Sequence, residues 1–253
     1  MSEALERLYQ RFKPCVVCVV VRDANGDLHR GAAFHIGNGF LATARHVVEN
    51  IEIVEIVPHH YAHKPIQVRR VHLHPAERVD VAVLETDFSL EHFMTKVQIV
   101  EGDGFREKTD FVPIGGHLDD WVGDELVLSK AVLIGYPPVP RIRSLVAVAV
   151  ETEVNAVVDR YDGPHAHFIV SAVPRGGFSG GPVLSEYGFL LGVLTDSLHR
   201  GDQPYELGFS SVVSIEPLLE MIDALGLECG ANSALARELF GTGDAASGQD
   251  QSR

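Results

Sequence analysis

A serine within a glycine-rich turn is the residue whose chemistry is clearest in this sequence. Ser179 stands in the segment Gly-Phe-Ser-Gly-Gly-Pro, between two apolar runs. Glycines adopt backbone conformations that other residues avoid, so the chain can turn sharply here and present the Ser179 hydroxyl outward. The backbone N–H groups of Gly177 and Ser179 are then expected to point into one small space, which is the geometry that holds a developing oxyanion. The segment predicts a serine nucleophile in acyl-transfer chemistry.

A serine nucleophile needs a base in contact with it, usually a neutral imidazole whose tautomer is fixed by a carboxylate. Among the 13 histidines, His46 has the most suitable setting, because it follows the apolar run 40–44 at the end of a predicted strand. Asp80 opens another apolar run, where a carboxylate is costly unless it is hydrogen-bonded or paired. We therefore predict His46 as the general base and Asp80 as its orienting carboxylate. Arg45, beside the histidine, is expected to point to solvent.

Two other interpretations of these segments were weighed. Gly-x-Ser-x-Gly also marks the nucleophile elbow of α/β-hydrolases, in which an acid and then a histidine follow the serine along the chain. Here only His199 follows Ser179, without a separate acid-bearing strand between them, and strands do not alternate with helices. The α/β-hydrolase interpretation is therefore rejected. Taken singly, the three segments also fit a plain glycine loop, a solvated histidine and a strand-start aspartate, but their combination favours a catalytic site.

Short strands dominate the elements that must position these residues. Valine-rich runs alternate with turns rich in Gly, Pro and Asp, which is typical of an all-β barrel or sandwich. Asn25-Gly26 and Asn38-Gly39 each predict a hairpin, the first with a two-residue loop. The region 101–123, rich in glycine and charge, is expected to link two β units, each with room for six strands.

We therefore predict an all-β protein made of two six-stranded antiparallel barrels followed by a C-terminal helix. The expected units are an N-terminal helix at 1–12, a first barrel at 13–110, a second barrel at 111–214, a C-terminal helical segment at 215–240 and a disordered tail at 241–253. His46 and Asp80 would lie on the first barrel and Ser179 on the second. The helical segment should contain helices at 215–225 and 233–240.

Composition narrows the classes of function. The chain has 253 residues, of which 45% are hydrophobic and 22% are charged, the balance of an ordinary globular protein. Its formal net charge is −14, so no binding to nucleic acid or to an anionic membrane is expected. The N-terminus lacks the apolar core of a secretory signal, and no run approaches the roughly 20 apolar residues of a membrane helix. We therefore expect a cytoplasmic protein.

Five histidines in one stretch of the chain invite a metal interpretation: His59, His60, His63, His72 and His74. Prolines bracket the first three and the neighbouring runs are strands, so a solvated loop is the better interpretation. His165 and His167 face one side of a strand, again without an apparent third ligand. Cys15 and Cys18 would face opposite sides of a strand, which suits neither a redox pair nor a chelate. The sequence therefore predicts no metal site and no cofactor.

Together, the three segments resemble the trypsin-like, chymotrypsin-fold serine peptidases, especially the bacterial HtrA-type branch. GFLATARHVV matches the histidine box of this family, DVAVLE its aspartate box and GGFSGGPVL its serine box, in the order His, Asp, Ser. The resemblance covers roughly residues 16–219 and implies two chymotrypsin-type barrels with the site between them. It implies Ser179 as nucleophile, His46 as general base and later acid, Asp80 as orienting carboxylate, and the amides of Gly177 and Ser179 as the oxyanion hole.

The sequence departs from the digestive members of this family at Phe178, where they carry an aspartate that captures a newly cut N-terminus. Activity without zymogen cleavage is therefore expected. The residues after Ser210 are too few for a PDZ module in addition to the C-terminal helix, so none is expected.

The resemblance also implies a primary specificity pocket with Val173 at its base. Its walls would be formed by Thr195, Asp196, Ser197, Gly208 and Phe209. No carboxylate stands at the base, so a small or medium aliphatic side chain is expected before the scissile bond. Ordinary barrel packing is the alternative for these residues.

These expectations combine into a serine endopeptidase that cleaves a protein or peptide substrate through a Ser-His-Asp triad and an acyl-enzyme. The alternative from another class is a catalytically silent protease-fold protein that binds or scaffolds a partner, since a fold alone does not establish activity. An esterase or a narrow self-processing enzyme on the same site is a third interpretation. The sequence assigns no oligomeric state, natural substrate or trigger.

Overall fold

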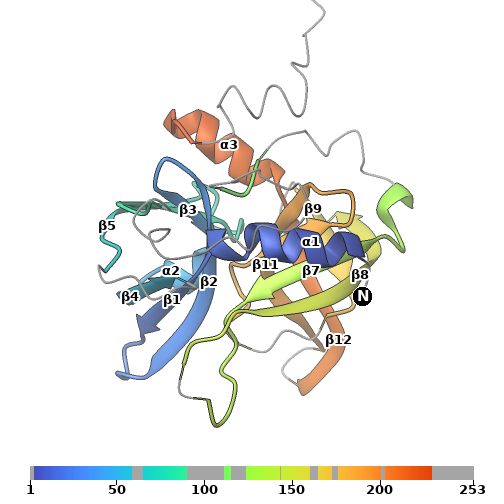
Figure 1. The fold of residues 1–253 in the computed structure, drawn as a ribbon, viewed down its shortest axis with the longest axis horizontal. Coiled ribbons are helices and arrows are strands. Elements are labelled where there is room, and N and C mark those ends of the chain that lie inside the picture. The colour runs from blue at the N-terminus through green and yellow to red at the C-terminus, as the bar shows by residue number, and fades with distance from the viewer. Residues whose placement is uncertain are drawn as a thin grey trace, which may run out of the picture.

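The computed structural model describes residues 3–58, 65–89, 111–114, 124–142, 144–159, 165–172, 176–200 and 203–229, with the backbone alone for 124, 196–200 and 203–207. Two β units lie side by side, the first built from the N-terminal half of the chain and the second from the C-terminal half (Figure 1).

The first unit is a six-stranded antiparallel sheet with the order β4-β1-β2-β3-β6-β5. A short 3-10 helix, η1 (Lys13–Cys15), leads into β1, and the short helix α2 (Arg45–Val48) follows β3. The strands are β1 (Val16–Arg22), β2 (Leu28–Gly37), β3 (Phe40–Thr43), β4 (Glu52–Pro58), β5 (Val68–Leu73) and β6 (Ala82–Thr86). The valine-rich β1 pairs with both β2 and β4 and is almost entirely buried, as β-branched residues in an inner strand should be.

The second unit is a closed barrel with the order β10-β11-β12-β9-β8-β7. A 3-10 turn, η5 (Asp124–Leu126), precedes it. Its strands are β7 (Lys130–Gly135), β8 (Val148–Asp159), β9 (Ala166–Val170), β10 (Pro182–Ser185), β11 (Leu190–Arg200) and β12 (Gln203–Ser214). Closure gives every strand two hydrogen-bonded neighbours, so this unit is a firm base for the turn that carries Ser179.

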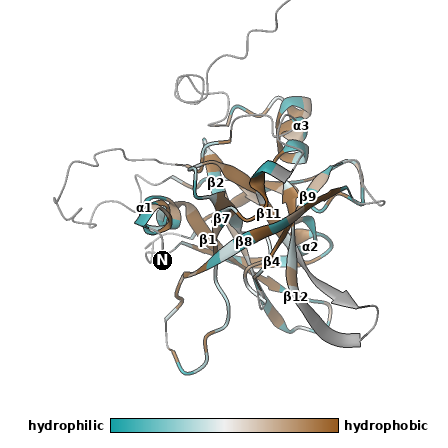
Figure 2. Ribbon diagram, turned by 90° about the vertical axis from the view of Figure 1, so that its right-hand side faces the viewer, coloured by the Kyte–Doolittle hydropathy of each residue, from teal (hydrophilic) through white to brown (hydrophobic). Residues whose placement is uncertain are grey.

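Two amphipathic helices cover the β units. Helix α1 (Glu3–Phe12) buries Leu5 and Phe12 and lies along β7 of the second unit (Figure 1). Helix α3 (Glu216–Leu225) also buries an apolar face and ends at Gly226, whose left-handed backbone caps the helix. Figure 2 shows both polar and apolar residues on each helix, as expected of helices with one face on a sheet and one in water.

Both predicted hairpins are present, but their loops differ. Gly37 pairs with Phe40, which leaves Asn38 and Gly39 as a two-residue loop with positive φ at both positions. In the first hairpin Arg22 pairs with Leu28, so the loop spans residues 23–27 and the predicted two-residue loop is wrong. The reason is the carboxylate of Asp23, which accepts hydrogen bonds from the backbone N–H groups of Asn25 and Asp27 and stabilises the wider turn.

The predicted fold class is confirmed, with one refinement: the second unit is a closed barrel and the first is an open, half-barrel sheet. The domain boundaries stay predictions. Val112, near the expected start of the second unit, donates its N–H to the carbonyl of His35 in β2 (2.8 Å). The helix expected at 233–240 and the tail at 241–253 lie outside the described residues.

Tyr136 connects the two units. Its ring is fully buried, and its hydroxyl donates to the carbonyl of Val16 in β1 at 2.7 Å. Burial raises the pKa of this hydroxyl far above its usual value, so it stays a donor at physiological pH. The backbone N–H of Tyr136 donates to the carbonyl of Gly177 (2.8 Å), so the same residue also holds the turn that carries Ser179.

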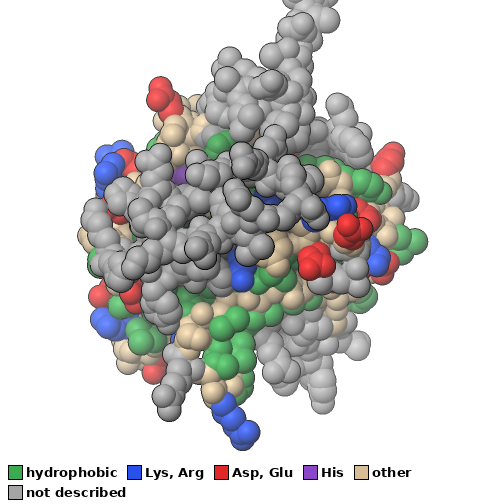
Figure 3. All heavy atoms as spheres, in the orientation of Figure 1, with side chains coloured by type: hydrophobic (Ala, Val, Ile, Leu, Met, Phe, Trp, Pro, Cys, Tyr) green, Lys and Arg blue, Asp and Glu red, His purple; other side chains and the backbone are tan. Residues whose placement is uncertain are grey.

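The surface carries charges of both signs. On the face drawn in Figure 3, the described Lys and Arg side chains stand among Asp and Glu side chains. Within the described part of the chain, the helices are too short or too polar to cross a membrane.

Candidate active site

His46 lies in the short helix α2, immediately after β3. Strand β3 ends at Thr43 and the helix begins at Arg45, so the histidine is on a helical turn rather than on the strand end that the sequence suggested. The next residue, Val47, is buried and packs against Gly31 of β2, where any side chain would collide with it. This packing holds the helix on the sheet and leaves the His46 side chain 49% exposed.

Asp80 contacts His46 at two points. The His46 Nδ1 atom lies 2.7 Å from one carboxylate oxygen of Asp80, and the His46 backbone N–H donates to the other at 2.8 Å. A carboxylate accepts hydrogen bonds only, so Nδ1 must carry a proton, and in the neutral ring Nε2 then has the lone pair. The contact therefore sets both the tautomer and the orientation of the ring, as a general base requires.

Arg45 does not point to solvent, and that expectation is wrong. Its side chain is buried: one guanidinium nitrogen donates to the carbonyls of His74 (2.9 Å) and Ala76 (3.4 Å), and another pairs with Glu49. The pair with Glu49 raises the pKa of the guanidinium and neutralises its charge locally. Arg45 thus ties the helix of His46 to the segment that leads to Asp80.

Ser179 lies in a turn that is anchored on both β units. Its carbonyl accepts a hydrogen bond from the N–H of Ala32 in β2 (2.8 Å), which belongs to the first unit. On the other side, the N–H of Gly180 donates to the carbonyl of Leu194 in β11 (2.8 Å). The turn is therefore fixed at the seam between the two units, with the Ser179 side chain only partly buried.

Glycine is required in this turn for two reasons. Gly177 and Gly180 have φ values of +101° and +84°, which side-chain-bearing residues rarely adopt. A Cβ at Gly180 would also collide with the Ala32 carbonyl and the Thr43 hydroxyl. Because Thr43 ends the strand that leads into α2, this close contact brings the serine turn against the base of the His46 helix.

Phe178 anchors the turn in the second unit. It is buried, and its ring lies where a side chain on Gly135 of β7 would otherwise stand. The turn is thus held by apolar packing at the position where the digestive peptidases use a carboxylate.

The residues predicted for the substrate pocket lie on two paired strands, as far as they are described. Val173 lies outside the described residues. Thr195 is buried, and its hydroxyl donates to the carbonyl of Ser211 (3.2 Å), so its side chain follows the packing alternative. Asp196 and Ser197 pair with β12 through their backbone, and on that strand Gly208 has positive φ and Phe209 is 39% exposed.

The histidines considered as metal ligands fall into two groups. His59, His60 and His63 lie outside the described residues. His72 lies 3.7 Å from Glu85 on the neighbouring strand, whereas His74 lies beside His165 of the second unit.

Comparison with known proteins assigns the chain to a family. The family model for the trypsin-like peptidase domain matches residues 31–193, a stretch that contains His46, Asp80 and Ser179. The chain belongs to the trypsin-like peptidase family. Among curated protein sequences, no match reaches significance.

Solved structures similar to this trypsin-like peptidase include bacterial proteases. The active form of the Rv3671c protease from M. tuberculosis has a TM-score of 0.61 and 17% identity, over 89% of this chain and 87% of that one. The HtrA-type protease AlgW with a tripeptide has a TM-score of 0.63 and 16% identity, over 87% of this chain and 63% of that one. The peptidase described here therefore spans less than two thirds of the AlgW chain. At these identities the likeness shows the fold.

Sequence reasoning missed the residues that hold the site together. Arg45 and Tyr136 make their contacts with backbone carbonyls far along the chain, and no local pattern marks such partners. Phe178 was noticed only as the replacement of an aspartate, although its burial against β7 is one of the contacts that hold the turn.

Proposed function

We propose that this trypsin-like peptidase is a serine endopeptidase with Ser179 as nucleophile, His46 as general base and Asp80 as the orienting carboxylate. The observation that carries the proposal is the two-point contact between His46 and Asp80, which sets the histidine tautomer that a serine needs. The packing of the serine turn against Ala32 and Thr43 supports it, because Thr43 ends the strand that leads into the helix of His46.

The reaction would follow from these positions. The Ser179 hydroxyl attacks the carbonyl carbon of the scissile bond while its proton passes to Nε2 of His46, and Asp80 stabilises the imidazolium. The N–H groups of Gly177 and Ser179 hold the negative oxygen of the tetrahedral intermediate. His46 then protonates the leaving amine, which gives an acyl-enzyme, and water activated by the same histidine releases the acid and restores Ser179.

We further propose that the enzyme is active without zymogen cleavage. The burial of Phe178 against Gly135 fixes the serine turn without an ion pair to a newly formed N-terminus. Hydrogen bonds from Ala32 and Tyr136 to the turn act in the same direction.

Protein or peptide chains are the proposed substrates, with an aliphatic side chain before the scissile bond. Strand β10 pairs with residues 190–193 of β11, and the backbones of Gly180 and Gly181 form hydrogen bonds with Leu194. Residues 195–197 therefore extend β11 beyond the turn that carries Ser179. A substrate strand would add to this segment through backbone hydrogen bonds. The exposed ring of Phe209 on the adjacent strand would contribute apolar surface.

A fluorophosphonate probe and unfolded casein test the proposal together. The wild type should be labelled at Ser179 and should cleave casein, whereas Ser179→Ala should do neither. Ser144→Ala is the matched control, because Ser144 is an exposed loop serine whose loss should change nothing. If the probe does not label the wild type, the proposed enzymatic activity is contradicted and a binding role is left. Labelling without casein cleavage would indicate a narrow substrate range.

A further inference from the structure

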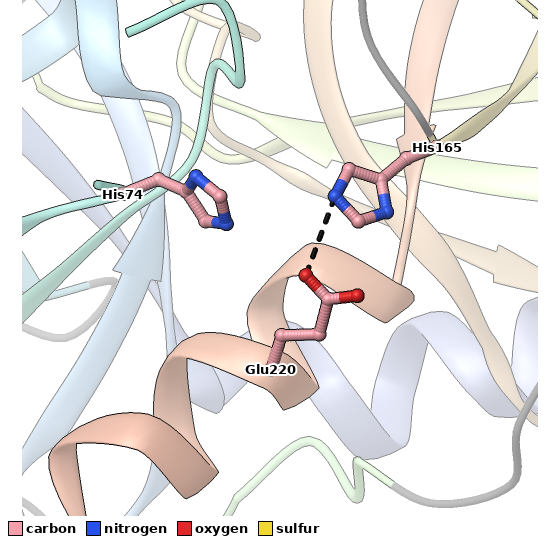
Figure 4. Close-up of side chains that lie close together, drawn as sticks. All are labelled: His74, His165 and Glu220. Atoms are coloured by element: carbon pink, nitrogen blue, oxygen red, sulfur yellow. Dashed lines mark ion pairs between the residues drawn. The ribbon is translucent and has the colours of Figure 1, made fainter. Parts of the chain in front are cut away.

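Three side chains from three separate elements meet beside the junction of the two β units. His74 follows β5, His165 precedes β9 and Glu220 lies on α3. One ligand atom from each lies within 4.8 Å of the others. Figure 4 shows both rings and the carboxylate directed toward a common space.

The two histidines are interior residues and the glutamate is not. His74 is 6% exposed and His165 is 8% exposed, while the Glu220 side chain is 60% exposed. The rings meet edge to face, with centroids 6.0 Å apart. Nε2 of His165 lies 3.4 Å from a carboxylate oxygen of Glu220. Two buried imidazoles therefore lie beside the more exposed carboxylate of Glu220, a combination that suits a cation site open to solvent.

Burial favours the neutral form of His74. Burial lowers the pKa of His74, and the neighbouring His165 and Arg45 act in the same direction, whereas Glu220 opposes them. Arg45 is already paired with Glu49, so its charge is partly compensated. Neutral imidazole is the form that binds metals.

We propose that His74, His165 and Glu220 bind a divalent metal ion of the zinc type. Two imidazole nitrogens and one carboxylate oxygen form a donor set that zinc uses with water in the fourth position. With bonds of about 2.1 Å, a tetrahedral ion needs its donors about 3.4 Å apart. The His165–Glu220 pair has this spacing, and a small rotation of the His74 ring brings the third donor in from within 4.8 Å.

Occupancy of this site would reach the segment that carries Asp80. The backbone N–H of Ala76 donates to Nδ1 of His74 at 3.2 Å, so Nδ1 presents a lone pair. When Nε2 binds a metal, the neutral ring must carry its proton on Nδ1, and two donors then face each other. The turn 74–76, which Arg45 also holds, has to rearrange. This part rests on the proposed function: we expect the metal to reduce peptidase activity and a chelator to restore it.

Calorimetric titration with zinc ions and the absorption spectrum with cobalt ions test the site directly. The wild type should bind one equivalent, and Glu220→Gln and His165→Gln should bind roughly tenfold more weakly or worse. Asp223→Asn is the matched control, because it removes the same charge from an exposed position on the same helix. Glu220 is exposed, so its replacement tests the site even if the His165 variant does not fold. Absent binding in the wild type, or equal affinity in wild type and Glu220→Gln, would overturn the proposal.

Activity is measured separately, so that the two proposals fail differently. A wild type that binds zinc but is never labelled by the fluorophosphonate probe would contradict the proposed function and leave the metal site standing. If the probe labels the wild type but its rate of peptide cleavage is unchanged at saturating zinc, the proposed effect of the metal on the segment that carries Asp80 is contradicted.

Discussion

Arg45 shows how one buried side chain joins two segments of the proposed active site. Its backbone precedes His46, while its guanidinium binds the carbonyls of His74 and Ala76 on the segment that leads to Asp80. A planar guanidinium reaches these carbonyls and Glu49 at once through its fixed fork of donors. A lysine ammonium has neither the fork nor the geometry, so the two cations are not equivalent here.

Replacing Arg45 with methionine is expected to lower kcat roughly 10- to 100-fold with little change in KM, because a displaced Asp80 no longer orients His46. Arg45→Lys should recover part of the loss. Steady-state kinetics on a peptide substrate measure both constants, and Arg70→Met, an exposed position on β5, is the control. An unchanged kcat in a folded Arg45→Met variant would refute this role.

Glu49, the partner of Arg45, gives a prediction about pH. The hydrogen bond from Arg45 lowers the pKa of the Glu49 carboxyl below its usual 4.5. A carboxyl with a lowered folded-state pKa stabilises the protein fully above the unfolded value, and this stabilisation is lost as pH falls through the folded value. Glu49→Gln should therefore lower the unfolding midpoint slightly at pH 7 and have no effect well below pH 4.5. Thermal melts across this pH range measure the unfolding midpoint, with Glu52→Gln, which removes the carboxylate of an exposed ion pair, as the control. An effect of the opposite sign would contradict this prediction.

Residue types could be predicted where a short local pattern carries the chemistry. The glycines around Ser179 form one such pattern, and the Asp80 carboxylate directly before an apolar run forms another. The direction of Arg45 could not be predicted, because it depends on two carbonyls of a distant turn.

The turn of residues 176–181 is the element that decides whether the two units share a site. Its glycines bring its backbone against β2 and β3 of the first unit and against β7 of the second. In this turn the same glycines have positive φ and make the close contacts. The two effects on stability can therefore be separated only by comparison with a glycine that has positive φ but no close contact.

Gly180→Ala is expected to lower the free energy of unfolding by about 2 kcal/mol or more and to abolish probe labelling, because the new methyl group collides with the Ala32 carbonyl. Gly188 has φ +95° with open space around it, so Gly188→Ala reports backbone strain alone. It should cost about 1 kcal/mol and keep the labelling. Urea denaturation measures both variants, and equal losses would show that the contact with the first unit contributes nothing.

Turns and helix starts were predictable where the residue types favour a single backbone conformation. Asn38-Gly39 needs positive φ at both positions, which the two residue types favour, and the expected loop is present. The loop at 23–27 and the start of α2 at Arg45 escaped prediction, because a side-chain acceptor and the packing of Val47 decide them.

At the scale of the whole molecule, Tyr136 makes a fully buried polar contact across the seam between the two units. Tyr136→Phe leaves the Val16 carbonyl without its donor and is expected to cost about 1–3 kcal/mol of unfolding free energy. Tyr187, which is 66% exposed, gives the control variant Tyr187→Phe, with an expected change within about 0.5 kcal/mol. Denaturant unfolding followed by fluorescence measures the difference, and equal stability of the two variants would contradict this account of the seam.

The fold class was predictable because the twelve strands within the described residues leave a repeated pattern of valine runs and turns. The meeting of His74, His165 and Glu220 was not predictable, because it depends on how α3 crosses the junction. From the sequence His165 had no third ligand, and the missing groups lie on a different unit and on a helix.

The placement of α1 has a consequence for synthesis on the ribosome. The helix leaves the ribosome before every strand of the first sheet, yet it lies along β7, and the Tyr9 hydroxyl donates to the carbonyl of Ala147. While the first sheet is being translated, the apolar face of the helix therefore lacks the β7 strand that contacts it in the folded protein. Nascent chains stalled before β7 should expose Leu5 and Phe12 to proteolysis and to chaperones, and chains extended past β8 should protect them.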